Sequence, residues 1–135
     1  MNPNTQQTTG EHLLLMRGTH WNSGLSPAEL QRIMTDFYGW VEGLQRKGIL
    51  RGAQPLMEEG KLVSGAQGLV TDGAFAESKE AIAGYFLLSV ATTEEAVKLA
   101  QACPTLAYGV QIEVRPIADL CRPMADVKAA SLSNP

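Results

Sequence analysis

The sequence predicts an α+β fold in which four antiparallel strands form one sheet and two helices cover one face of it. Three observations predict this class. Residues 26–48 and 92–103 are amphipathic segments that begin with helix-capping residues. Residues 108–115 alternate strictly between apolar and polar side chains, as a half-buried strand does. Apolar runs flank both helical segments, so the order is βαββαβ with a hairpin inserted between the second and third strands.

The first strand is expected over residues 11–17, where an apolar run ends at Gly18. Residues 1–10 before it are polar and predict a flexible tail. The loop that follows, residues 18–25, contains His20. This imidazole is a candidate to close over a ligand, and an ordinary surface histidine is the alternative.

The first helix has clear start and stop signals. Ser26 suits the N-cap, Pro27 suits the first helical position, and Glu29 completes a capping box three residues after the cap. The helix is expected to end at Lys47, because cations favour the negative C-terminal end of a helix and Gly48 suits the position after it.

The remaining elements follow from apolar runs and turn residues. Strands are expected over residues 49–57, 81–90 and 108–115, and the inserted hairpin over residues 61–71. The second helix, residues 92–103, opens on another capping box and ends before a proline.

The strand over residues 81–90 predicts a homodimer. Two helices can cover only one face of the sheet, yet this strand is apolar on both faces. Exposed apolar patches of this size mark interfaces, and twofold pairing is the commonest arrangement. We therefore expect two copies to pair their sheets face to face. Residues 117–135, beyond a folded domain over residues 11–116, lack periodicity and predict a loose extension that wraps a neighbour.

Composition excludes several classes of function. The chain has 135 residues, a formal net charge of −3 and a pI of about 5.3, so it lacks the basic surface of nucleic-acid binders. No apolar run reaches the ~20 residues that span a bilayer, and the polar N-terminus is unlike a signal peptide, which predicts a cytoplasmic protein. Cys103 and Cys121 match no metal spacing, and the chain has two histidines, so we expect no metal site and no cofactor.

The polar segment before the strand at residues 81–90 supplies one group of candidate site residues. Asp72 is the candidate general base, and a carboxylate that only bonds its own turn is the alternative. Phe75 and Tyr85 would desolvate it and contact a ligand. Lys79 would hold a carboxylate or enolate if it points inward, and a solvated surface ion pair is the alternative.

Arg17 and Arg115 supply a second group. Each ends an expected strand, and two guanidiniums at one end of the sheet would bind an anion bidentately. Ion pairs with Glu113 and Glu11 are the alternative. Glu113 has the same parity as Arg115, so both are expected on the sheet face away from the helices. Gln54 is a further candidate to line a pocket through its side-chain amide.

Several segments of the chain match one known family. Thr71-Asp72-Gly73-Ala74-Phe75-Ala76-Glu77-Ser78-Lys79-Glu80 resembles the signature of the YCII-related family, in the branch named after its Asp-Gly-Pro-Phe motif. Shorter matches bring the resemblance to about residues 11–116, and they lie at residues 14–18, 25–30, 52–56 and 114–116. The resemblance implies a ferredoxin-like protomer and a dimeric α/β barrel, in agreement with the fold expected from the residues themselves.

The resemblance does not supply a mechanism. The family's proposed catalytic pair is a histidine on the first helix and an aspartate near the end of the second. In this chain the first helix has no histidine, Cys103-Pro104 stands near the end of the second, and Ala74 replaces the proline of the motif. Two hypotheses remain. One is a small-molecule-binding dimer with cofactor-independent acid–base chemistry on a small anionic or aromatic substrate. The other is a non-catalytic binding or regulatory module, for example an accessory to a transcription regulator.

Overall fold

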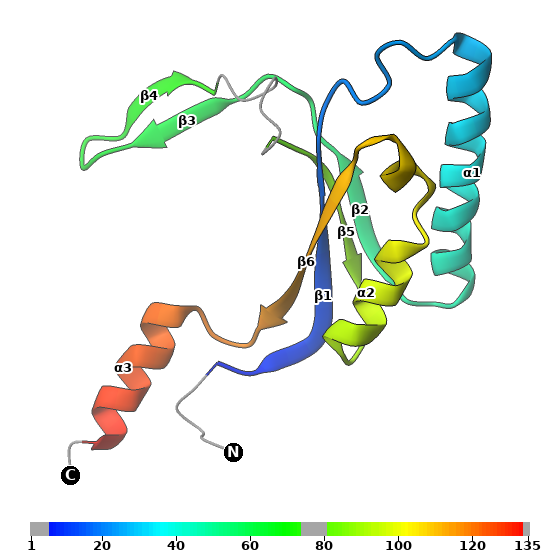
Figure 1. The fold of residues 1–135 in the computed structure, drawn as a ribbon. Coiled ribbons are helices and arrows are strands. Elements are labelled where there is room, and N and C mark those ends of the chain that lie inside the picture. Colours follow the sequence, from blue (N-terminus) through cyan, green and yellow to red (C-terminus); the bar gives the residue numbers. More distant parts are fainter. Residues whose placement is uncertain (1–5, 74–80, 134–135) are drawn as a thin grey trace.

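The computed structural model describes residues 6–73 and 81–133. Within them lie a four-stranded sheet, a separate two-stranded hairpin and three α-helices (Figure 1). The strands are β1 (Thr8–Arg17), β2 (Leu50–Pro55), β3 (Lys61–Ser64), β4 (Leu69–Asp72), β5 (Ile82–Leu88) and β6 (Gln111–Ala118). The α-helices are α1 (Pro27–Arg46), α2 (Thr93–Gln101) and α3 (Arg122–Ser133), and a 3₁₀-helix, η1, spans Pro104–Tyr108.

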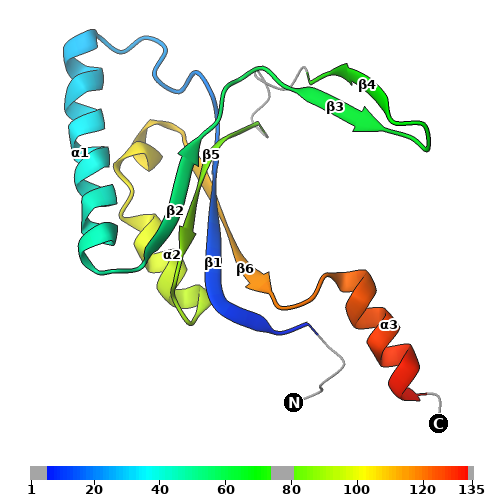
Figure 2. The same cartoon turned by 180° about the vertical axis from the view of Figure 1, so that it is seen from behind.

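The main sheet has the strand order β2-β5-β1-β6, and every neighbouring pair is antiparallel. Helices α1 and α2 both lie on one side of it, as the two opposite views show (Figures 1 and 2). This is the ferredoxin-like arrangement, so the α+β fold expected from the sequence is confirmed. The predicted hairpin is present as β3–β4, and it extends away from the opposite side of the sheet.

Side-chain alternation divides the sheet into a helix-covered face and an open face. In β1, His12, Leu14 and Met16 are buried, whereas the residues between them are only partly buried. In β5, Phe86 and Leu88 are buried in the same way. The core therefore lies between the sheet and helices α1 and α2, and the other face of the sheet carries no helix in the described part of the chain.

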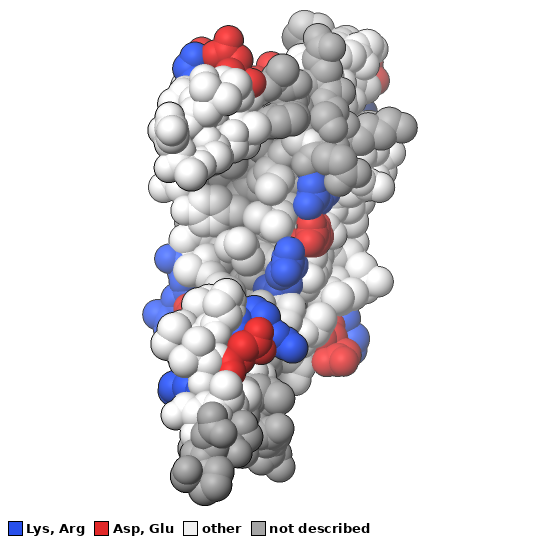
Figure 3. All heavy atoms as spheres, turned by 90° about the vertical axis from the view of Figure 1, so that its left-hand side faces the viewer, with Lys and Arg blue, Asp and Glu red and all other residues white. Residues whose placement is uncertain are grey.

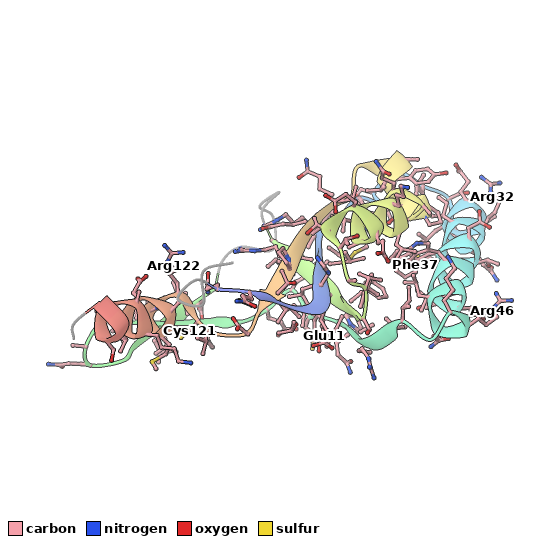
Figure 4. All side chains as sticks on the ribbon, turned by 90° about the horizontal axis from the view of Figure 1, so that it is seen from below. Glu11, Arg32, Phe37, Arg46, Cys121 and Arg122 are labelled. Carbon is pink, nitrogen blue, oxygen red and sulfur yellow. The ribbon has the colours of Figure 1, made fainter. Side chains whose placement is uncertain are left out.

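Helix α1 forms where its capping signals predict. The Ser26 hydroxyl accepts from the Glu29 amide at 3.1 Å, and the Glu29 carboxylate accepts from the Ser26 amide at 3.2 Å. Phe37 points from the helix toward the sheet, while Arg32 and Arg46 point outward (Figure 4). The ring of Phe37 meets Phe86 edge-on with centroids 6.1 Å apart, which ties the helix to β5.

The segment from α2 to β6 corrects the sequence analysis in two details. Thr92 caps α2 as expected, but the Glu95 carboxylate accepts from the Thr92 hydroxyl at 3.2 Å instead of from a backbone amide, so the capping box is incomplete. The last strand begins at Gln111, not at residue 108, because Pro104 opens the 3₁₀-helix η1 and Gly109 ends it with a φ of 98°.

Both ends of the described chain are more ordered than expected. The extension is not a loose coil, because it forms helix α3 over Arg122–Ser133. Strand β1 starts at Thr8, three residues before the expected start. The residues before it are also held, since the Gln6 side chain donates to the Leu120 carbonyl at 2.7 Å and the Gln7 amide donates to the Asp119 carboxylate at 3.0 Å. No helix in the described ranges is both long and apolar enough to span a membrane.

Candidate functional site

A cavity of about 360 Å³ lies between α1 and the sheet. Its walls come from α1, the loop after β1, η1 and the paired strands β2 and β5, and they are mainly aromatic and aliphatic. Trp21, Phe37 and Phe86 are among the lining residues. Cavities of this size and apolar character are typical of small-molecule sites.

Gly84 shapes the floor of the cavity. A Cβ atom at this position would lie 2.8 Å from the Gln54 carbonyl oxygen and 3.2 Å from Pro55 Cα, so no other residue fits without moving β2. A glycine inside an apolar strand often marks a close approach of backbone or ligand. Here it allows β2 and β5 to pair tightly and leaves space beneath α1.

A small number of polar groups border the cavity. Gln54 and Tyr85 are paired across β2 and β5 and are among the lining residues, but Tyr85 alternates with the buried Gly84 and Phe86, so both side chains project from the open face. Thr105 is buried, and its hydroxyl lies 3.2 Å from the Cys103 sulfur. Cys103 is also buried. Among residues 6–73 and 81–133, no Lys, Arg, Asp or Glu lines this cavity.

A second polar group lies on the open face. The Arg17 Nε donates to a Glu113 carboxylate oxygen at 3.0 Å, and a second guanidinium nitrogen of Arg17 contacts the same oxygen. Arg115 lies 3.6 Å from the other oxygen. The hydrogen bonds from Arg17 hold the pKa of Glu113 below its ordinary value, and the charge of Arg115 adds to this effect. Glu113 therefore pairs with both arginines, whereas the sequence-based alternative named Glu113 and Glu11 as their partners.

The expected placement of the two arginines at one end of the sheet needs correction. Strands β1 and β6 are antiparallel, so Arg17 stands opposite Gln111 at one end of the ladder. Arg115 stands opposite Leu13, four pairs further along β1. The arginines are connected through Glu113, and this carboxylate occupies the space in which an anion would have to bind both.

The rest of the open face is mostly uncharged. Gln54, Tyr85, Leu15 and Glu113 form one row across all four strands, and the next row contains Leu87, Leu13 and Arg115. Figure 3 looks onto this side of the molecule and shows a column of basic and acidic side chains beside a broad uncharged surface. This surface is the face that the sequence analysis expected to pair with a second copy.

A model of the YCII-related domain matches residues 19–120, about three quarters of the chain. The chain belongs to the YCII-related family. A comparison with curated proteins finds no match. The match does not separate branches of the family, so the Asp-Gly-Pro-Phe branch rests on the resemblance of one motif.

The described part of that motif, residues 71–73, lies away from the cavity. Asp72, the candidate base, lies on β4 with its side chain 82% exposed, where it forms an ion pair with Lys61. It does not line the cavity, and the desolvation that a general base would need is absent. Phe75 and Lys79 lie outside the described residues.

The histidines are accounted for by other contacts. The ring nitrogens of His12 lie 3.1 Å from the Val90 carbonyl and 3.1 Å from the Thr93 hydroxyl, so this residue is structural. His20 lies 3.6 Å from the Glu58 carboxylate and is about half exposed. Across residues 6–73 and 81–133, no three His, Cys, Asp or Glu side chains gather as metal ligands would.

Sequence reasoning missed most of the cavity, because its lining resembles ordinary core. Phe37 and Met34 belong to the apolar stripe of α1, which was assigned to packing. Two signals were available. Gly84 interrupts an apolar strand, and Trp21 is a large aromatic residue in a loop directly after β1.

Proposed function

We propose that this YCII-related protein binds a small, uncharged aromatic molecule in the cavity between α1 and the sheet. The aromatic lining carries the proposal: Trp21, Phe37 and Phe86 line the cavity from the loop after β1, from α1 and from β5. An apolar cavity of roughly 150 Å³ is enough for a benzene molecule. The cavity of about 360 Å³ is more than twice as large and suits a ligand of one or two rings.

The absence of charge along the cavity wall favours a neutral ligand over an anion. A buried carboxylate without a cation or several donors is costly, and the lining offers no Lys or Arg from the described part of the chain. Tyr38 and Thr105 can instead orient a hydroxyl, carbonyl or ring nitrogen. The proposal therefore follows the non-catalytic hypothesis. Asp72 has no part in it, because it lies on the exposed hairpin.

The proposal includes a homodimer that pairs open sheet faces. Leu13, Leu15, Tyr85 and Leu87 lie on this face, and in the single chain none of them is fully buried. A face of this kind is normally covered in a stable protein. A regulatory role for the bound molecule is the extension of this proposal that the family resemblance suggests.

The ligand part is tested with a matched pair of probes, 2-naphthol and 2-naphthoic acid, which share one ring system. At pH 7.5 the first is neutral and the second is an anion. Isothermal titration should show tighter binding of 2-naphthol by at least ~10-fold, a difference of about 1.4 kcal/mol. Equal or tighter binding of the carboxylate would overturn the proposed ligand class.

Two variants locate the site. Ala53→Leu places a larger side chain on the cavity wall and should reduce affinity for 2-naphthol by at least ~10-fold, which corresponds to about 1.4 kcal/mol. Ala102→Leu is the matched control, because it makes the same change at an exposed position after α2. If both variants bind as the unmodified protein does, the ligand is not in this cavity.

A further inference from the structure

The hairpin β3–β4 exposes aliphatic side chains on both of its faces. Val63 and Val70 form a cross-strand pair on one face, and Leu62 and Leu69 lie on the other. Their exposures are 64%, 57%, 45% and 66% respectively. A two-stranded hairpin is marginally stable alone, so this one needs contacts beyond those that the described residues of the single chain give it.

Helix α3 has the same property. Met124 and Val127 are 47% and 58% exposed, and only Ala125 is buried among the residues whose burial is described in this helix. A helix of twelve residues is marginal in water unless one of its faces packs against something. An exposed Val and Met on such a helix therefore indicate a surface that is covered in the working protein.

Both elements extend from the same side of the sheet. In Figures 1 and 2, β3–β4 and α3 reach away from α1 and α2, one near each end of the strands. Figure 3 shows the open face between them. The protomer is therefore shaped like a bracket, with the uncharged sheet face as its back. We call β3–β4 and α3 the two arms.

We propose that the two arms clasp a second copy of this chain that has docked on the open sheet face. This inference rests on the homodimer of the proposed function and adds the surfaces that stabilise it. A copy seated on the sheet lies between the arms, so sheet and arms form one continuous interface. In a twofold dimer each copy also offers its arms to the other, which covers all four arms at once.

The charges of the arms favour an apolar partner over a charged one. Lys61 pairs with Asp72 within the hairpin, and Arg122 pairs with Asp126 at 3.4 Å within α3. Each arm thus neutralises these charges internally and presents aliphatic side chains beside them. A nucleic acid or an anionic membrane would require a net basic surface. The apolar open face and arms of a second copy are a matching surface.

The test measures dimer dissociation by sedimentation velocity for three variants. The hairpin variant carries Val63→Thr and Val70→Thr, which keep the β-branched shape and the strand propensity. The helix variant carries Val127→Ser. The control is Val97→Thr on α2, an exposed valine on the opposite side of the sheet. Each arm variant should raise the dimer Kd at least ~10-fold, about 1.4 kcal/mol, while the control stays within about twofold.

Hydrogen exchange gives a second readout that does not depend on a variant. Amides of β3–β4 should be protected in the concentrated protein and lose protection as dilution dissociates the dimer. Two results together would overturn the clasp: a dimer Kd that neither arm variant changes, and hairpin amides that exchange fast at every concentration. They would still be consistent with a dimer formed through the sheet faces alone. A monomer at all concentrations would overturn both. Unchanged 2-naphthol titrations in the arm variants show that the cavity is intact, so loss of the clasp and loss of the ligand site are distinguishable.

Discussion

The substitution His12→Leu tests whether the hydrogen bonds of the buried His12 imidazole stabilise the core of this YCII-related protein more than an apolar side chain would. His12 is 0% exposed, and its Nδ1 lies 3.1 Å from the Val90 carbonyl, which can only accept a hydrogen bond. Nδ1 therefore donates to this carbonyl, and Nε2 shares a hydrogen bond with the Thr93 hydroxyl at 3.1 Å. These two bonds connect β1 to the start of α2.

The magnitude follows from what the substitution leaves behind. Val90 is 6% exposed, so its carbonyl would be buried without a donor, which costs about 1–3 kcal/mol. Thr93 is exposed and can bond to water, so its lost hydrogen bond costs only about 0.5–1.5 kcal/mol. Leucine recovers roughly 1–2 kcal/mol through its apolar surface. Central values leave a net loss of about 1.5 kcal/mol.

Urea denaturation at constant pH measures this difference. The hydrophobic contribution alone predicts that His12→Leu is stabilising, whereas the unpaired Val90 carbonyl predicts that it is destabilising. The sign of the change in unfolding free energy therefore shows which of the two effects is larger. Thr93→Ser is the control, and it should cost less than about 1 kcal/mol, because the hydroxyl beside Nε2 and the bond to Val90 both survive. A His12→Leu variant as stable as the unmodified protein would refute the reasoning.

Three further predictions concern a carboxylate, a cap and a glycine. Glu113→Gln should destabilise the folded protein most above pH 4.5, the ordinary carboxyl pKa, and this loss should shrink as the pH falls through the lowered pKa of the folded state. A difference in urea midpoints between variant and unmodified protein that does not change with pH would contradict this. Ser26→Ala should cost about 1 kcal/mol in the same assay, while Ser26→Gly costs only a few tenths, because glycine is tolerated at an N-cap. Gly84→Ala should cost about 1–3 kcal/mol and weaken 2-naphthol binding, since β2 must shift; an unchanged melting temperature would show that β2 adapts freely.

Local signals in the sequence were enough to predict most of the fold. Ser26 and Glu29 marked the start of α1, and the alternation around Val114 marked β6. The apolar character of both faces of β5 identified the sheet face that is left open. These features succeed because caps and strand parity are decided by neighbours in the chain.

The candidate site was harder, because it depends on contacts between distant segments. Asp72 was attractive for its neighbours in sequence, but the hairpin carries it away from the cavity to Lys61. Arg17 and Glu113 were recognised, yet their contact is set by the register of β1 and β6. Helix α3 was missed because its apolar residues do not form a continuous stripe that a single chain could bury.

Mapping of amide chemical shifts tests the central claim most directly, namely that the cavity under α1 is the ligand site. In ¹H–¹⁵N spectra titrated with 2-naphthol, we expect the largest shifts at Gly18, Gly84 and Thr105, which line the cavity from three different segments. Shifts centred on Arg17 and Arg115 instead, with the cavity amides unchanged, would place the ligand on the open face and contradict the claim.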